Sequence, residues 1–123
     1  MTPTHVVSEL VPYAHVADVQ RSIDFYGRLG FEATDVSLDE GATVWALLRC
    51  GEARLMVAQA GEPVVPEKQA ILFYLFTPDL AALREQLVDA GVPVGEIGFP
   101  DYMPGGEMRL EDPDRYVLLI AQR

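Results

Sequence analysis

Side chains that could carry chemistry are few in this chain, and they stand far apart in the sequence. The chain has two histidines and one cysteine, and His15 falls inside an apolar, strand-like run. His15 could contact a ligand or act as a general base, and a hydrogen-bonded strand histidine is an equally good interpretation. Cys50 could be a reactive thiol, but its place between two strand-like runs favours a turn residue. Glu107 with His5 or Glu9 would make an improvised metal site, which no tight motif supports.

A short segment that occurs twice shows how the elements around these residues are organised. Residues 55–59 (LMVAQ) return as residues 118–122 (LLIAQ), 63 positions later. A second similarity, offset by 61, links residues 18–30 to residues 79–91, each an acidic residue, an amphipathic run and a closing glycine. Two similarities with nearly the same offset indicate a duplicated supersecondary unit.

The first unit is predicted to fold as β-α-β-β-β. Apolar alternation over residues 10–17 predicts a strand, Asp18 is a helix N-cap, and apolar residues at helical spacing continue to Gly30. Further strands are predicted at residues 31–38, 43–49 and 53–59, the last two joined by a turn at Cys50-Gly51.

The second unit is predicted to repeat this order after a linker at residues 61–68, which carries two prolines and little periodicity. Its helix is expected to have Pro78 at the first helical position and to end at Gly91. Its strands are predicted at residues 70–76, 92–97, 107–111 and 116–121. A loop rich in proline and glycine occupies residues 99–106, and Asp112-Pro113-Asp114-Arg115 forms the final turn.

Composition excludes several classes of protein. The chain has 123 residues, within the range of one domain, and no apolar run approaches the roughly 18 residues that cross a bilayer. Its net charge of −10 argues against nucleic acid and anionic membranes as partners, because both need a basic surface. A protein located in the cytoplasm is therefore expected.

Three motifs, in order and with matching spacing, point to a known family: VADVQRSIDFYGRLGF, TPDLAALREQLVDAGV and EDPDRYVLL. Over about residues 8–122 the chain resembles the glyoxalase/bleomycin-resistance/dioxygenase group, the vicinal oxygen chelate superfamily. The resemblance implies an α+β fold of two tandem βαβββ modules, about residues 8–60 and 69–122, on either side of the linker. Such modules form a cup-shaped mixed sheet, with the helices on the convex face and a ligand or metal on the concave face.

The resemblance also implies where a metal would be held. By motif spacing, the four strand positions that bear ligands in metal-containing relatives fall on Val11, Met56, Leu72 and Leu119. Carboxylate oxygens or imidazole nitrogens hold divalent ions of this kind, and one thioether among aliphatic side chains supplies neither. We therefore expect no metal and no other cofactor.

Side-chain alternation along the same strands predicts which other residues face into the cup. These predicted ligand-binding residues are Tyr13, His15, Trp45, Arg54, Met56, Tyr74, Phe76 and Met108. Trp45 is expected opposite Met56, Leu47 opposite Arg54, and Met108 opposite Leu119. An apolar cup with a few polar groups is typical of a small-molecule site, although each aromatic residue could also be ordinary core. The alternating Glu107, Arg109 and Glu111 are predicted to be a solvated strand face.

Two hypotheses about function follow. The first is a metal-independent protein that binds a small molecule, for example to sequester a toxic or antibiotic compound. The second is an enzyme, either a glyoxalase or dioxygenase relative with relocated metal ligands or a metal-free catalyst that uses His15 as general base. The four apolar positions favour the first.

Two further expectations concern assembly and strain. A homodimer is expected, because one βαβββ unit leaves sheet edges and an apolar flank uncovered. Relatives usually have glycine where this chain has Arg115, so Arg115 should bear local strain if the turn is unchanged.

Overall fold

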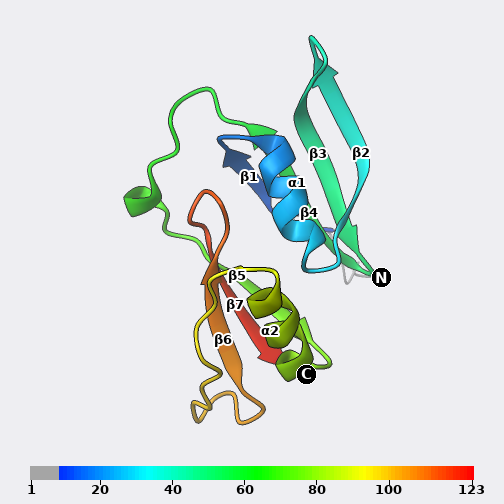
Figure 1. Cartoon of the computed structure of the whole chain (residues 1–123). Helices are drawn as coiled ribbons and strands as arrows, with labels where there is room; N and C mark the ends of the chain where they lie inside the picture. Colours follow the sequence, from blue (N-terminus) through cyan, green and yellow to red (C-terminus); the bar gives the residue numbers. More distant parts are fainter. Residues whose placement is uncertain (1–8) are drawn as a thin grey trace, which may run out of the picture. The chain divides into compact units, whose positions relative to one another are not determined.

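The computed structural model describes residues 9–123, and the chain divides into two compact units, one ending at Gly61 and the other beginning at Glu62 (Figure 1). The first unit contains, in order, β1 (Tyr13–Val16), α1 (Val19–Gly27), β2 (Glu32–Asp39), β3 (Ala42–Cys50) and β4 (Ala53–Gln59). The second contains a 3-10 turn (Pro66–Lys68), β5 (Phe73–Thr77), α2 (Leu80–Asp89), β6 (Glu107–Glu111) and β7 (Val117–Gln122). The predicted α+β class is therefore confirmed. Within the described part of the chain, neither α1 nor α2 has the length and apolarity needed to cross a membrane.

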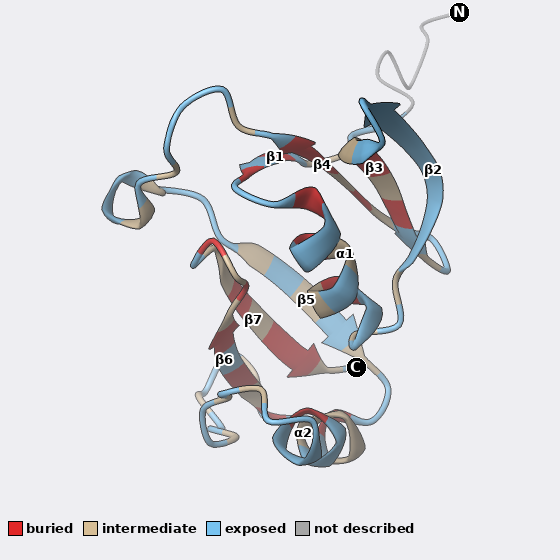
Figure 2. Ribbon diagram, turned by 45° about the horizontal axis from the view of Figure 1, so that its top comes forward, coloured by how far each residue is buried: buried red, intermediate tan, exposed pale blue. Residues whose placement is uncertain are grey.

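A four-stranded mixed sheet with one helix makes up the first unit. The strand order is β1-β4-β3-β2, with β1 parallel to β4 and the other neighbours antiparallel. α1 lies against one face of this sheet and contacts β3 and β4 (Figure 2). Its Val19 and Tyr26 are buried together with the strand residues Ala14, Val16, Ala46, Leu48 and Val57. Each fully buried aliphatic side chain of this kind contributes about 1.5–3 kcal/mol, so the helix-covered face holds the unit together.

The second unit has the same plan with one strand fewer. Its order is β5-β7-β6, with β5 parallel to β7 and β6 antiparallel to it. α2 contacts β7 and buries Leu80 and Leu87. The sheet contributes Met108, Leu110, Leu118 and Ile120 to the same core.

In each unit, side-chain hydrogen bonds connect the end of the last strand to the start of the helix. The same residue types make these bonds in both units. At the end of β4, Gln59 Nε2 donates to the carbonyl oxygen of Ala17 at 2.6 Å. At the end of β7, Gln122 Nε2 donates to the carbonyl oxygen of Pro78 at 2.5 Å. In both units the next residue is the aspartate that caps the helix: Asp18 Oδ1 accepts from Arg21 N at 3.1 Å, and Asp79 Oδ1 accepts from Ala82 N at 3.0 Å. The repeated sequence therefore has a repeated structural role.

Two predictions for the second unit are wrong. The strand expected at residues 92–97 does not form, because Pro93 has no N–H to donate and Gly95 weakens extended pairing. Only Gly95 N, which donates to Arg109 O at 2.9 Å, and a single bridge between Gly98 and Glu107 tie this segment to β6. Pro78 is not the first helical residue, because Asp79 is the N-cap and Pro78 precedes it.

Arg115 adopts the strained conformation that the sequence led us to expect. Its φ angle is +66°, in the left-handed region that favours glycine. The turn is held by buried Asp112, whose Oδ1 accepts from the backbone nitrogens of Asp114 and Tyr116, both at 2.9 Å. The guanidinium of Arg115 pairs with Glu111 at 3.5 Å and with Glu67 at 3.7 Å.

This geometry predicts that Arg115→Gly is more stable than Arg115→Ala, by up to about 1 kcal/mol. Both variants lose the exposed ion pairs, which contribute little. Only glycine also removes the left-handed strain. Urea unfolding of the two variants beside the parent protein measures the difference, and equal stabilities would show that the turn stores no strain at this residue.

Candidate functional site

The face of the first sheet opposite α1 carries the predicted site residues of that unit. Residues paired across neighbouring strands share a face, and two such rows lie here. From β1 through β4 to β3, the rows are Tyr13/Met56/Leu47 and His15/Ala58/Trp45. The rings of Tyr13 and His15 are 5.6 Å apart. An imidazole and an indole thus flank a small alanine on one open face.

The pairing of β3 with β4 differs from the predicted register by two residues. Trp45 lies opposite Ala58 rather than Met56, and Leu47 lies opposite Met56 rather than Arg54. The cause is the turn, because Cys50 pairs with Ala53 and the loop is therefore Gly51-Glu52. A shift of two residues leaves every side chain on its predicted face, since the side-chain period of a strand is two.

Arg54 faces the same side as Met56, and it has a partner there. Its guanidinium forms an ion pair with Glu9, and both side chains are partly exposed. An ion pair in this setting contributes little to stability. Arg54 is thus held at the edge of the open face by an acidic residue just before β1.

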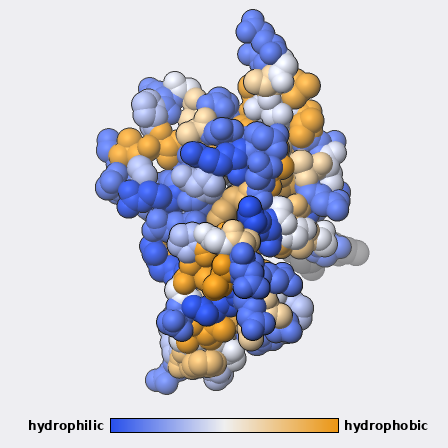
Figure 3. Space-filling view, viewed as in Figure 1, coloured by the Kyte–Doolittle hydropathy of each residue, from blue (hydrophilic) through white to orange (hydrophobic). Residues whose placement is uncertain are grey.

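The open face of the second sheet has a different chemical character. From β5 through β7 to β6, its rows are Tyr74/Leu119/Arg109 and Phe76/Ala121/Glu107. Tyr74 is 39% exposed and Phe76 is 48% exposed, and the guanidinium of Arg123 lies 4.3 Å from the centroid of the Phe76 ring. Apolar side chains reach the surface of both units in patches bordered by hydrophilic ones (Figure 3).

Met108 does not lie where the sequence led us to expect. It pairs with Ile120 rather than Leu119 and is 1% exposed, which places it in the core beneath the sheet. The register slips by one residue because Asp112 pairs with Tyr116 inside the turn. A one-residue slip moves a side chain to the opposite face, so Arg109 takes the place expected for Met108.

Glu107 is the polar centre of the second open face. Its Oε2 accepts the hydroxyl of Tyr74 at 2.5 Å, and its Oε1 accepts the hydroxyl of Tyr102. These hydrogen bonds raise the pKa of Tyr74 to about 12, raise the pKa of Tyr102 and lower the pKa of Glu107. The sequence predicted Glu107 to lie on a solvated strand face. In the structure its carboxylate also belongs to a cluster with the aromatic side chains of Tyr74 and Tyr102. Tyr102 was missed, because it lies in a proline- and glycine-rich loop without periodicity.

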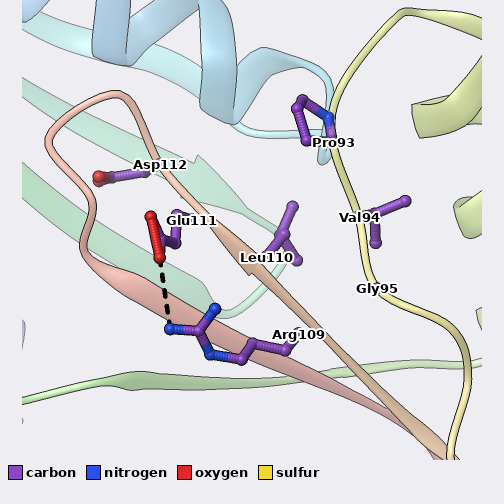
Figure 4. A pocket seen from close by; sticks show the side chains of 7 residues that line it. All are labelled: Pro93, Val94, Gly95, Arg109, Leu110, Glu111 and Asp112. Atoms are coloured by element: carbon purple, nitrogen blue, oxygen red, sulfur yellow. Dashed lines mark hydrogen bonds and ion pairs between the residues drawn. The ribbon is translucent and has the colours of Figure 1, made fainter.

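Two shallow, open hollows adjoin β6. One, of about 480 Å³, is lined by residues of the loop and of β6 and β7, among them Phe99, Pro100, Tyr102, Glu107, Arg109, Leu119 and the predicted site residue Met108. The other, of about 530 Å³, lies between residues 93–95 and 109–112 and contains the Arg109–Glu111 ion pair (Figure 4). The first hollow combines apolar walls with a carboxylate, as small-molecule sites do.

The residues present do not fit a metal site of the family type. Met56 and Leu119 lie on the open faces, Leu72 lies just before β5, and Val11 lies just before β1, and none carries an oxygen or nitrogen donor in its side chain. Within residues 9–123, no three His, Cys, Asp or Glu side chains group closely enough to hold an ion. His5, part of the improvised site considered above, lies outside the described residues.

Comparison with known proteins gives the family. A model described as the Glyoxalase/Bleomycin resistance protein/Dioxygenase superfamily matches residues 4–120, so the chain belongs to that superfamily. A search of curated proteins found no match. The superfamily includes both enzymes and resistance proteins, so membership defines the class of protein without defining its activity.

Solved structures share the fold. A bleomycin resistance determinant encoded on the transposon Tn5 is 22% identical, with a TM-score of 0.76 over 95% of this chain and 98% of that chain. A bleomycin-binding protein complexed with bleomycin is also 22% identical, with a TM-score of 0.75 over 95% of this chain and 99% of that chain. TnmS3, an antibiotic-binding protein from a Streptomyces species, is 25% identical, with a TM-score of 0.70 over 96% of this chain and 98% of that chain.

The hydrogen bonds at Glu107 predict the titration of the tyrosines. In Glu107→Gln, the pKa of Tyr74 should fall from about 12 toward the ordinary value near 10, because the negative acceptor that stabilises the protonated phenol is gone. Absorbance of tyrosinate during an alkaline titration measures this, with Tyr74→Phe to assign the signal. Glu111→Gln is the matched control, since Glu111 shares the strand face but bonds to arginines. An unchanged titration in Glu107→Gln would contradict the assignment.

Proposed function

We propose that this protein binds a small, antibiotic-like molecule without a metal ion and works as a homodimer. The observation that carries the proposal is the composition of the two open sheet faces. Both present exposed aromatic side chains, and the four positions that would hold a metal in metal-containing relatives are apolar: Val11, Met56, Leu72 and Leu119.

The physical basis for binding is the aromatic surface itself. Tyr13 and Trp45 in the first unit stand on the sheet face opposite α1, and Tyr74 and Phe76 in the second stand on the face opposite α2. Stacking on such rings contributes roughly 0.5–1.5 kcal/mol beyond the area buried. In the first unit the small side chain of Ala58 stands between His15 and Trp45, so a planar ligand could lie against the indole.

Similar structures support the ligand class. Bleomycin is the compound bound in one neighbour of this fold, and TnmS3 is described as an antibiotic-binding protein. Within the proposal, His15 and Met56 line the ligand site beside Trp45, and Arg54 lies at its edge.

Binding of bleomycin tests the proposal. Titration should quench the fluorescence of Trp45, the only tryptophan, and the affinity should be unchanged after treatment with EDTA. Elemental analysis of the purified protein should find no stoichiometric zinc, nickel, manganese or iron. One equivalent of metal per chain, with an activity lost on chelation, would overturn the proposal in favour of an enzyme. A panel of planar antibiotics that all fail to bind would also contradict it.

Calorimetry on variants assigns the first open face. Trp45→Ala should weaken binding about tenfold or more, because both stacking and buried area are lost. Trp45→Phe keeps an aromatic ring and should retain most of the affinity. Phe25→Ala is a matched control, since Phe25 lies on α1 and not on the open face. Equal affinity in Trp45→Ala and the parent protein would remove this face from the site.

The proposed homodimer follows from apolar surface and free strand edges. Large apolar side chains in both units are more than half exposed, including Leu10, Leu38, Ile71 and Phe99. Within their own sheets, β1 and β5 each pair on one side only, and such edges favour association. Light scattering should give about twice the 13.6 kDa mass of one chain. A mass of one chain at micromolar concentration would contradict the dimer.

A further inference from the structure

We propose that Glu107, together with Tyr74 and Tyr102, forms a subsite that recognises a protonated amine on the ligand, and that the adjoining hollow takes the apolar body of the same molecule. This inference rests on the proposed function and adds a ligand class to it. It concerns only the second unit.

The first observation is that the charge of Glu107 is not neutralised by the protein. Arg109, two residues along the same strand face, pairs with Glu111 at 3.3 Å, and Arg84 pairs with Glu96 at 3.5 Å. Within residues 9–123, no lysine or arginine forms an ion pair with Glu107. A half-buried carboxylate with neutral hydroxyl partners is therefore available to a cation from outside.

The second observation is that the carboxylate is already oriented. Each of its oxygens accepts one tyrosine hydroxyl, so each retains a lone pair for a further donor. Tyr74 stands on β5 and Glu107 on β6, so the tyrosine side chain passes over β7, which lies between them. A site fixed before binding loses less conformational entropy when the ligand arrives.

The third observation is that a cation already lies on the same row of side chains. Phe76, Ala121 and Glu107 are neighbours across the three strands, and the guanidinium of Arg123 lies over the Phe76 ring. An aromatic face attracts cations through its quadrupole. Phe76 and Glu107 stand on either side of Ala121 in this row, so the aromatic ring and the carboxylate face the same side of the sheet.

The hollow beside Glu107 fits the remainder of such a ligand. Its volume of about 480 Å³ is within the range of drug-sized sites, and Phe99, Pro100 and Leu119 supply apolar wall. Glu96 also lines it but pairs with Arg84, which leaves Glu107 as the carboxylate without an ionic partner there. The net charge of −10 further raises the local concentration of cations.

A pair of matched probes tests the subsite. Naphthalen-1-ylmethylamine and the neutral naphthalen-1-ylmethanol have the same apolar body, and the amine should bind roughly tenfold more tightly by calorimetry, because a hydrogen bond to a charged group is stronger. Glu107→Gln should abolish this preference. Glu96→Gln removes one negative charge from the wall of the same hollow and should retain it.

The tyrosines are positioning residues, and pH reveals their role. Binding of the amine should be lost as the pH falls through the pKa of Glu107, which the tyrosine hydroxyls hold below its usual range. Tyr102→Phe removes one donor to the ionised carboxylate, so this acid limb should move to higher pH. A merely structural role for Tyr102 would not move it.

The outcomes distinguish the subsite from the proposed function. If bleomycin binds but the amine and the alcohol bind equally, or if Glu107→Gln keeps the preference for the amine, the subsite is overturned and the proposed function stands. If the parent protein binds the amine more tightly than the alcohol, if Glu107→Gln binds the two equally, and if no antibiotic binds, the subsite stands and the proposed function fails. Thermal unfolding of each variant confirms that it is folded.

Discussion

A side-chain amide at the end of the last strand of each unit fastens that strand to the start of the helix. Gln59 and Gln122 both donate to the carbonyl oxygen of the residue before the capping aspartate. Backbone bonds accompany them, from Ala60 N to Val16 O at 2.8 Å and from Arg123 N to Thr77 O at 2.9 Å. The first and last strands of a unit are distant in sequence and parallel, so this closure fixes the sheet and leaves one of its faces to the helix.

Once the helix occupies one face, the other face is free to carry function. The central strand places a small alanine there in both units, Ala58 in β4 and Ala121 in β7. The residues on either side have diverged. His15 and Trp45 flank the first alanine, whereas Phe76 and Glu107 flank the second. Duplication has thus produced two similar scaffolds with different surface chemistry.

The superfamily includes proteins that act on their ligand and proteins that hold it. In metal-containing members, donor atoms at a few strand positions hold the ion, and by motif spacing the corresponding positions here are Val11, Met56, Leu72 and Leu119. Aliphatic side chains and a thioether cannot replace the carboxylates and imidazoles that bind a divalent ion. The polar groups on the open faces lie elsewhere, with Glu107 engaged by two tyrosines and Arg54 by Glu9.

Much of the fold could be predicted because local physics and the repeat agree. The capping aspartates, the amphipathic helices and the hairpin from β3 to β4 follow from short-range rules, and the offset between repeats relates one unit to the other. The strand expected at residues 92–97 does not form, because the prediction followed the alternation of apolar residues and gave too little weight to Pro93 and Gly95. Local sequence also indicated the strain at Arg115, since the turn motif prescribes its backbone conformation.

The sequence by itself determined the duplicated units, the capping aspartates and the absence of oxygen and nitrogen donors at Val11, Met56, Leu72 and Leu119, because these depend on residue type and on short-range spacing. Only the tertiary structure decided the register of the hairpins, which put Met108 in the core and Arg109 on the open face. It alone joined Tyr74, Tyr102 and Glu107, which come from a strand, a loop and another strand. Such contacts join residues that are far apart in the sequence, and they form only when the whole unit folds. The local conformational preferences of the residues therefore do not encode them.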